Sequence, residues 1–373
     1  MPPATLLIKP VSNSCNMRCQ YCFYADVSKH RSTASYGAMS LQTLETLVRK
    51  TFNYAEGYCS FAFQGGEPTL AGIDFFENFV RLQREYNINN IKVNNSVQTN
   101  GYKLGGEWAE FFVRHNFLTG ISLDGTKAAH DNFRKGADGL GTYDDVVRTV
   151  DLFMERGVDF NILCVVNNLV ASQPENIYKA LKKYKYIQFI PCIEDFDSGS
   201  PSPYSLDADN YARFLISAFD FYYDDYMRGD YVSVRNFDNY IDMLLGNEPE
   251  QCGMTGVCMC YFLVEADGGV YPCDFYVLDE WKIGNVNENS FTRMMKSAAA
   301  REFVETSLNV HADCVDCEWR SLCRGGCRRH REPFFGGVLS KNVLCGAYKK
   351  FFQHSIGKMQ RIASSIRYER GSI

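Results

Sequence analysis

The chain has 373 residues, of which 46% are hydrophobic and 22% are charged. These fractions are typical of folded globular proteins and exclude a disordered, collagen-like or coiled-coil chain. The net charge of −5 argues against a binding surface for nucleic acid or for an anionic membrane. No apolar run approaches the ~18 residues of a membrane span, and the start of the chain has no signal-peptide pattern, so we expect a cytoplasmic protein.

The first half of the chain alternates short β-type segments with amphipathic helical segments. We expect strands at Thr5–Lys9, Cys59–Phe63, Ile91–Gln98, Leu118–Leu123, Phe160–Val166 and Tyr186–Ile193. Helical spacing predicts helices at Ser40–Phe52, Asp74–Glu85, Glu107–His115, Tyr143–Arg156, Glu175–Tyr184 and Asp209–Met227. This alternation indicates an α/β fold with a parallel sheet covered by helices. Six β/α units are fewer than a full barrel needs, so we expect a partial (β/α)6 barrel of the TIM type.

The composition changes in the second half, where short strands, glycine turns and most of the clustered cysteines occur. The segment Asp195–Ser205 is expected to be a loop. Tyr261–Ala266 and Val270–Cys273 flank a glycine-rich turn and are expected to form a hairpin. We therefore place a domain boundary near residue 230, with one domain over 1–230 and a cysteine-rich domain with a C-terminal helix over 231–373.

The chain contains 15 cysteines. An odd number without an export signal argues against a disulfide framework and favours metal binding. Most of the cysteines fall into three groups, which are Cys15, Cys19 and Cys22; Cys252, Cys258, Cys260 and Cys273; and Cys314, Cys317, Cys323, Cys327 and Cys345. Cys59, Cys164 and Cys192 lie singly in apolar, β-rich runs, so we expect them in the core.

The first group has the spacing C-x3-C-x2-C and directly follows the first expected strand. Three thiolates leave one iron of a [4Fe–4S] cluster open, and that iron can chelate a small molecule through an amine and a carboxylate. A loop at the carboxyl end of a parallel strand is where barrels place their chemistry. The alternative is a structural zinc site with three cysteines.

At this point the sequence resembles the radical S-adenosylmethionine superfamily, whose signature has an aromatic residue before the last cysteine, here Tyr21. The run Gln64-Gly65-Gly66-Glu67-Pro68 follows the second strand and resembles the motif that meets the methionyl amine in that family. The resemblance implies S-adenosylmethionine as cofactor. It assigns cofactor contacts to Tyr21, Gln64, Gly65, Gly66, Glu67, Ser122, Arg134 and Ile193. For Arg134, a solvated surface position is the alternative.

The C-terminal cysteines resemble the twin-cluster extension called the SPASM domain. By that resemblance, one auxiliary [4Fe–4S] cluster is held by Cys252, Cys258, Cys273 and Cys327, and the second by Cys314, Cys317, Cys323 and Cys345. The expected total is therefore three [4Fe–4S] clusters. A zinc ribbon is the alternative for the third cysteine group. Cys258 and Cys260 compete for one ligand position, and the family spacing favours Cys258. Full ligation by four thiolates leaves no iron open to the substrate, so these clusters are expected to carry electrons or to stabilise the structure.

A narrower resemblance lies in Val270–Leu278, which is similar to the corresponding segment of the anaerobic sulfatase-maturating enzymes. The resemblance to that family extends over nearly the whole chain. Those enzymes oxidise a Cys or Ser in a Cys/Ser-x-Pro-x-Arg motif of a sulfatase to Cα-formylglycine. The resemblance implies abstraction of a Cβ hydrogen by a 5′-deoxyadenosyl radical, proton loss to Asp274, and electron transfer to an auxiliary cluster. Alone, Asp274 would be expected to be a solvated acid at the edge of a hairpin. Tyr24 is a candidate substrate contact or a cover for the cluster.

The expected partners are a sulfatase polypeptide and an electron donor such as flavodoxin or ferredoxin, with no nucleic acid and no membrane. A radical enzyme that crosslinks or epimerises a ribosomal peptide is one alternative, and a non-enzymatic iron–sulfur electron carrier is another. The run from Arg324 to Arg331 contains four arginines. It is expected to be either a solvated face or a source of charge near a cluster.

Overall fold

The computed structural model describes residues 3–196, 200–332 and 339–371. Two compact units make up the chain, and each combines several segments. Unit 1 contains Met1–Ser122, Asp131–Phe160 and Met259–Phe303, and unit 2 contains Leu123–His130, Asn161–Cys258 and Val304–Ile373. Both units take residues from either side of position 230, and the domain boundary predicted there stays a prediction.

Unit 1 is built on a largely parallel sheet. Its strands are β1 (Ala4–Ile8), β2 (Tyr58–Phe63), β3 (Lys92–Thr99), β4 (Phe117–Ser122), β8 (Phe262–Val264), β9 (Gly269–Tyr271) and β10 (Gly284–Asn285). Strand β1 pairs in parallel with both β2 and β8, and β2, β3 and β4 continue the sheet in parallel. The β8–β9 hairpin and β10 are antiparallel, so the late cysteine-rich segment adds strands beside the first strand of the chain.

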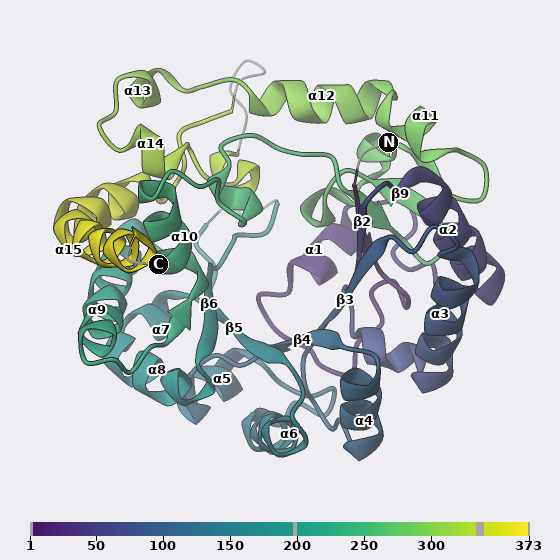
Figure 1. Ribbon diagram of the computed structural model, residues 1–373, viewed down its shortest axis with the longest axis horizontal. Helices are drawn as coiled ribbons and strands as arrows, with labels where there is room; N and C mark the ends of the chain where they lie inside the picture. The colour runs from purple at the N-terminus through teal and green to yellow at the C-terminus, as the bar shows by residue number, and fades with distance from the viewer. Residues whose placement is uncertain (1–2, 197–199, 333–338, 372–373) are drawn as a thin grey trace. The chain divides into compact units, whose positions relative to one another are not determined.

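The helices of unit 1 cover this sheet with apolar faces. They are α1 (Phe23–Lys29), α2 (Leu41–Tyr54), α3 (Ile73–Tyr86), α4 (Gly106–Arg114), α6 (Tyr143–Arg156), α11 (Phe291–Met295) and α12 (Ala298–Ser307), the last of which ends in unit 2. Figure 1 shows α2 and α3 side by side along β2 and β3. Phe63 of β2 packs against Phe76 and Phe79 of α3 at ring-centroid distances of 4.9 and 4.8 Å. Such aromatic burial fixes the orientation of α3 on the sheet.

Unit 2 contains three parallel strands, which are β5 (Phe160–Val166, from Asn161 on), β6 (Tyr186–Pro191) and β7 (Ser233–Val234). Its helices are α7 (Asn168–Ala171), α8 (Pro174–Leu181), α9 (Ala208–Met227), α10 (Arg235–Leu244), α13 (Ala312–Val315), α14 (Arg320–Cys323) and α15 (Cys345–Gly371), and α5 (Lys127–Phe133) has residues in both units. The long helix α15 packs along α9 (Figure 1). The rings of Phe351 in α15 and Phe219 in α9 have their centroids 5.7 Å apart.

The expected α/β class with a parallel sheet is confirmed, and every strand and helix predicted in the first half is present within a few residues. Gly157 is the C-cap of α6 with φ +71°, as the sequence predicts. Two details differ. Cys59 and Cys164 are buried, but Cys192 is only half-buried. Strand β6 ends at Pro191, two residues before Ile193. Residues 197–199 of the expected loop lie outside the described residues.

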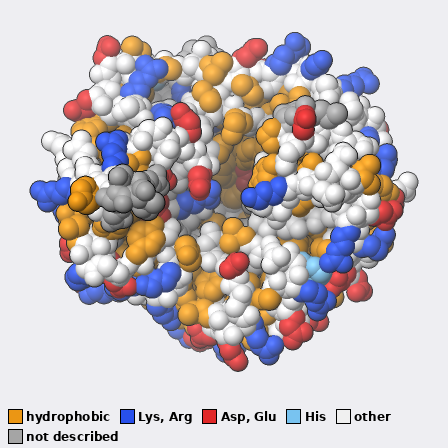
Figure 2. All heavy atoms as spheres, in the orientation of Figure 1, with side chains coloured by type: hydrophobic (Ala, Val, Ile, Leu, Met, Phe, Trp, Pro, Cys, Tyr) orange, Lys and Arg blue, Asp and Glu red, His pale blue; other side chains and the backbone are white. Residues whose placement is uncertain are grey.

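The surface carries both signs of charge. On the face shown in Figure 2, Lys and Arg side chains are interspersed with Asp and Glu side chains, in keeping with the net charge of −5. Within the described residues, no helix combines the length and the apolar character that a membrane crossing requires.

Candidate active site and cluster-ligand sites

The loop that carries Cys15, Cys19 and Cys22 begins directly after β1 and is held by backbone hydrogen bonds. The amide of Arg18 donates to the carbonyl of Lys135 at 2.7 Å, and the amide of Gln20 donates to that of Phe133 at 3.0 Å. These bonds lay the cysteine loop along the segment that follows α5. The same segment carries Arg134, which therefore lies beside the cysteines.

Arg134 is 6% exposed, so the alternative of a solvated surface position is wrong. Its Nη1 donates to Cys19 Sγ at 3.9 Å, and its guanidinium lies 5.3 Å from the ring centre of Tyr21. Cys15 Sγ accepts from the amide of Met17 at 3.4 Å and from Asn100 Nδ2 at 3.6 Å. The pKa of Cys15 is raised to about 11, chiefly by burial and also by the charges of Glu67 and Cys22, although the hydrogen bond from Met17 opposes the shift. A bound metal would reverse this by holding the thiolate.

The Gln64–Pro68 turn is shaped by two glycines for which no other residue would fit. Gly65 and Gly66 have φ of +86° and +57°, in the left-handed region. A Cβ on Gly65 would lie 2.5 Å from Lys9 Cε, and a Cβ on Gly66 would overlap the carbonyl oxygen of Ser14. The turn is therefore pressed against the residue that precedes Cys15.

The carboxylate of Glu67 holds this turn from inside. Its Oε1 accepts from Thr69 N at 3.1 Å, from Thr69 Oγ1 at 2.8 Å and from Thr99 Oγ1 at 2.8 Å, and its Oε2 accepts from the amide of Asn100 at 2.7 Å. Glu67 is 1% exposed, and burial raises its pKa. Three of these donors fall on Oε1 and one on Oε2, so Oε2 keeps room for a further donor. In this structure Glu67 therefore joins the end of β2 to the end of β3.

Five side chains of unit 1 meet in a group that we call the Asp274 cluster: Tyr24, Gln64, Tyr261, Cys273 and Asp274. Asp274 Oδ2 accepts from Gln64 Nε2 at 2.9 Å and from Tyr24 Oη at 3.4 Å. Asp274 Oδ1 accepts from Tyr261 Oη at 3.0 Å and from Cys273 Sγ at 3.4 Å. Gln64 Nε2 also donates to Tyr24 Oη at 2.6 Å. The members come from α1, the end of β2, the start of β8 and the end of β9.

Asp274 is 8% exposed, so the interpretation as a solvated hairpin acid is wrong. Burial raises its pKa, although the hydrogen bonds from Tyr261 and Cys273 and the charge of Lys9 act in the opposite direction. Burial also raises the pKa of Tyr24 well above its usual value, and the charge of Asp274 adds to this. Tyr24 is thus a neutral donor, and Asp274 is a buried acceptor beside a cysteine.

Beneath the Asp274 cluster lies a buried ion group that sequence reasoning missed. Glu265 Oε1 accepts from Lys9 Nζ at 2.5 Å and from Arg31 Nη1 at 2.7 Å. Lys9 is 1% exposed and Glu265 is 0% exposed. Lys9 Nζ also lies 5.2 Å from the ring centre of Tyr24. Lysine and glutamate at the ends of otherwise apolar strands were the available signal, because such residues are rarely buried unless they are paired.

Of the remaining predicted cofactor residues, only Ser122 is the last residue of a strand. Ser122 ends β4, as predicted, and its Oγ accepts from Gln98 Nε2 at 3.2 Å. Tyr21 is buried and packs on Phe133 at 6.0 Å. Ile193 is half-buried in unit 2. Among all the predicted cofactor residues, Gln64 is the one whose side chain belongs to the Asp274 cluster.

In unit 2, four cysteines line one cavity, and they are the set predicted for the second auxiliary cluster: Cys314, Cys317, Cys323 and Cys345. Trp319, Tyr348 and Phe352 complete its apolar wall. The pKa of Cys323 is raised to about 11, chiefly by burial and also by the neighbouring thiols of Cys345, Cys314 and Cys317. Four thiols facing one another across an apolar cavity fit the chemistry of an iron–sulfur cluster.

Of the set predicted for the first auxiliary cluster, Cys252, Cys258 and Cys327 belong to unit 2 and Cys273 to unit 1. Burial raises the pKa of Cys258, but Arg328 and Arg331 oppose the shift. Burial alone raises the pKa of Cys260 to about 12. Positive charge near Cys258 favours its thiolate, and the preference for Cys258 over Cys260 stays a prediction.

Among the described residues, no three His, Cys, Asp or Glu side chains converge closely enough to hold a single metal ion. A four-iron cluster is larger than one ion and requires more widely spaced thiols.

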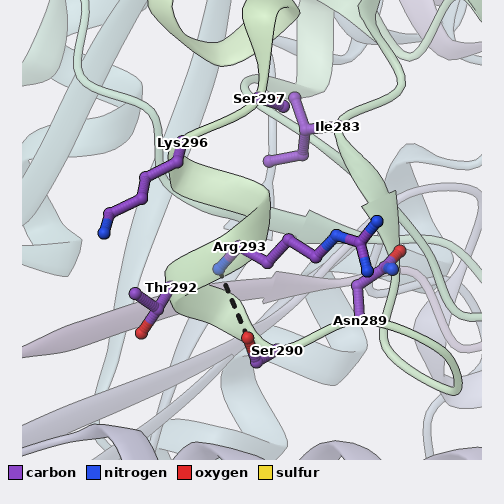
Figure 3. A pocket seen from close by; sticks show the side chains of 7 residues that line it. All are labelled: Ile283, Asn289, Ser290, Thr292, Arg293, Lys296 and Ser297. Carbon is purple, nitrogen blue, oxygen red and sulfur yellow. Dashed lines mark hydrogen bonds between the residues drawn. The ribbon is translucent and has the colours of Figure 1, made fainter.

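A separate hollow near α11 is lined by Ile283, Asn289, Ser290, Thr292, Arg293, Lys296 and Ser297 (Figure 3). It contains none of the predicted site residues, so it lies outside the candidate site.

Comparison with known proteins agrees with this geometry. The family model of the radical SAM superfamily matches residues 10–181, and that of an iron–sulfur cluster-binding domain, SPASM, matches residues 256–318. The cysteine-type anaerobic sulfatase-maturating enzyme of Clostridium novyi is 44% identical over 373 residues, which cover 99% of this chain and 100% of the relative. The chain belongs to the anaerobic sulfatase-maturating enzymes. It is therefore a radical SAM oxidoreductase, which uses S-adenosylmethionine and [4Fe–4S] clusters.

Three further matches, one by sequence and two by structure, show how far the similarity extends. The serine-type enzyme of Bacteroides thetaiotaomicron is 28% identical, over 94% of this chain and 89% of the relative. A solved structure of anSMEcpe with bound AdoMet and Cp18Cys peptide matches with a TM-score of 0.93 and 43% identity, over 98% of this chain and 100% of that one. Streptococcus suis SuiB bound to precursor peptide SuiA matches with a TM-score of 0.64 over 92% of this chain and 76% of that one. At 16% identity, this last match shows a shared fold alone.

Proposed function

We propose that this chain oxidises a cysteine in a sulfatase polypeptide to Cα-formylglycine and that Asp274 accepts the proton of the substrate side chain. The observation that supports this role is the Asp274 cluster. A carboxylate that is 8% exposed lies one residue from Cys273 and is oriented by donors on both of its oxygens. A buried acceptor with a defined direction is what a general base requires.

When bound, S-adenosylmethionine and the iron–sulfur clusters supply hydrogen-atom abstraction from the substrate Cβ and one-electron transfer. The substrate cysteine loses one hydrogen atom, one proton and one electron and becomes a thioaldehyde. The thioaldehyde then reacts with water, which gives the aldehyde and releases the sulfur as hydrogen sulfide. Asp274 takes the proton of the thiol. Gln64 and Tyr261 keep the carboxylate in place, and Tyr24, whose hydroxyl already contacts Asp274, is proposed to touch the substrate.

The cofactor roles of individual residues are also proposals. Cys15, Cys19 and Cys22 would hold the cluster with an open iron. Tyr21, Gln64, Gly65, Gly66, Glu67, Ser122, Arg134 and Ile193 would bind S-adenosylmethionine. The contact between Arg134 and Cys19 supports a place for this cation beside the cofactor. Because the Glu67 carboxylate already accepts four hydrogen bonds inside the protein, we infer that Glu67 acts mainly by presenting the backbone of the turn.

The auxiliary ligand sets follow the family assignment. Cys314, Cys317, Cys323 and Cys345 would hold one cluster, and their common cavity supports this. Cys252, Cys258, Cys273 and Cys327 would hold the other.

We also propose the two domains that were predicted from the sequence, over residues 1–230 and 231–373. Flavodoxin or ferredoxin is the proposed reductant, and the cytoplasmic location stays a prediction.

A preference for cysteine over serine is favoured by the higher identity to the cysteine-type relative, 44% against 28%. The test uses two peptides that differ in one atom, carrying Cys-x-Pro-x-Arg or Ser-x-Pro-x-Arg. The reconstituted enzyme is incubated anaerobically with each peptide, reductant and S-adenosylmethionine, and the products are followed by mass spectrometry. We expect the aldehyde from the cysteine peptide at a rate at least about tenfold that from the serine peptide, since a thiol loses its proton more readily.

Equal rates for the two peptides would contradict the cysteine preference but leave formylglycine formation intact. A crosslinked or epimerised peptide, without aldehyde, would instead contradict the proposed function.

A further inference from the structure

One buried cation in unit 2 has no anionic partner among the residues that the structure describes. Arg331 is 5% exposed, so it does not belong to a solvated basic face. Its Nη2 donates to the carbonyl of Asn309 at 2.6 Å, and its Nε donates to the carbonyl of Ser340 at 3.4 Å. Both acceptors are neutral, and no described carboxylate forms an ion pair with Arg331. A buried charge without compensation costs several kcal/mol, so a negative group is expected nearby.

The neighbours of Arg331 are cysteines of both predicted auxiliary sets. Arg331 and Cys314 line one cavity of unit 2. Burial lowers the pKa of Arg331, while the negative charges of Cys314, Cys258 and Cys323 oppose that shift. Cys314 and Cys323 belong to the second set and Cys258 to the first. Thiolates that carry iron–sulfur clusters would supply the missing negative charge at this point.

We propose that the guanidinium of Arg331 serves the auxiliary cluster site to which Cys314 belongs and raises the reduction potential of at least one auxiliary cluster. The proposal rests on the proposed function, because it assumes that these cysteines carry clusters. A cluster with four thiolates is anionic, and reduction by one electron adds a further negative charge. A buried cation close by stabilises the reduced form more than the oxidised form, because the local dielectric constant is low. The cluster then accepts the electron of the substrate radical more readily, and Arg331 itself is unchanged.

Arg331 also tethers two backbone segments, so the test must separate its charge from its hydrogen bonds. Arg331→Gln removes the charge and keeps donor capacity, whereas Arg331→Lys keeps the charge. Arg361→Gln is the matched control, because Arg361 is exposed on α15 and lies 16 residues, or about 24 Å along the helix, from Cys345. All three are made in the full chain carrying Cys15→Ala, Cys19→Ala and Cys22→Ala, so that only auxiliary clusters remain.

Each variant is reconstituted anaerobically, its iron is counted, and its clusters are titrated with reductant under electron paramagnetic resonance. We expect about eight iron atoms per chain in all variants. In Arg331→Gln at least one midpoint potential should become more negative, with Arg331→Lys shifted less and Arg361→Gln not at all.

Unchanged potentials in fully loaded Arg331→Gln would overturn the proposal. Loss of iron from both Arg331 variants would also overturn it, because the residue would then be structural. Loss of iron only from Arg331→Gln would overturn it too, because the charge would then be required for cluster binding rather than for the potential. If the parent protein itself bound no auxiliary clusters, the cluster assignment would fail instead, and the two failures are therefore distinguishable.

Discussion

At the residue scale, the proposed chemistry depends on Asp274, an acid that is buried away from water. Asp274 directly follows Cys273 in the sequence, but its partners Gln64 and Tyr24 are 210 and 250 residues away. Donors on both of its oxygens restrict the directions from which a substrate proton can arrive. The residue is thus placed by tertiary structure for a role that its sequence motif suggested.

Replacing Asp274 should separate the two halves of the reaction. Asp274→Asn keeps the size of the side chain and removes the base. We expect 5′-deoxyadenosine to be formed still, because hydrogen abstraction does not require the base, while formylglycine falls by about 10²-fold. Both products are quantified by mass spectrometry.

Glu280→Gln, at an exposed acid of the same segment, is the control and should leave both products unchanged. Wild-type formylglycine from Asp274→Asn would refute the assignment. So would a loss of clusters from this variant, since Asp274 would then be structural.

At the scale of elements, the candidate active site is a set of loops at strand ends that are joined by internal hydrogen bonds and ion pairs. The cysteine loop follows β1, the glycine turn follows β2, and Asp274 follows β9. Glu67 joins the turn to the end of β3, and the Lys9–Glu265 ion pair joins β1 to the hairpin β8–β9. These buried contacts hold loops in place that have little regular structure of their own.

The close approach of Gly66 to Ser14 predicts an effect on cofactor binding. In Gly66→Ala the new methyl group would overlap the Ser14 carbonyl and displace the loop before Cys15. Overpacking and left-handed strain together should cost about 2–4 kcal/mol and weaken S-adenosylmethionine binding. Gly157→Ala is the control, because Gly157 has φ +71° but nothing within 4 Å, and it should cost only about 1 kcal/mol.

Thermal unfolding and equilibrium binding of S-adenosylmethionine measure the two effects. If Gly66→Ala bound the cofactor as tightly as Gly157→Ala does, the turn would not control the cysteine loop.

At the scale of the whole molecule, the buried cysteines differ in position from those that we propose as cluster ligands. Cys59 and Cys164 are buried within strands, whereas the clustered cysteines are half-buried or exposed and lie on loops, on short helices or, for Cys345, at the start of α15. Their positions leave the thiols accessible to iron without disturbing the sheet.

The iron content of the chain should follow this division. Three [4Fe–4S] clusters require about 12 iron atoms, and the variant without Cys15, Cys19 and Cys22 should keep about eight and lose cleavage of S-adenosylmethionine. Cys260→Ala is the control and should keep about 12. Saturation of the wild-type chain near four iron atoms, or zinc at the C-terminal cysteines, would contradict the three-cluster assignment.

Local patterns were sufficient to predict the alternation of strands and helices, the hairpin and the grouping of the cysteines. Hydrophobic periodicity and ligand spacing act over a few residues, so they can be read without knowing the fold. Recognition of the family added the cofactors and the identity of Asp274.

Only the tertiary structure decided which polar side chains are buried and what they touch. Arg134, Asp274 and Arg331 each had a solvated alternative in the sequence, and all three are less than 10% exposed. The Lys9–Glu265 pair, 256 residues apart, left almost no local signal. Burial and long-range pairing depend on how distant segments pack together, and no short stretch of sequence contains that information.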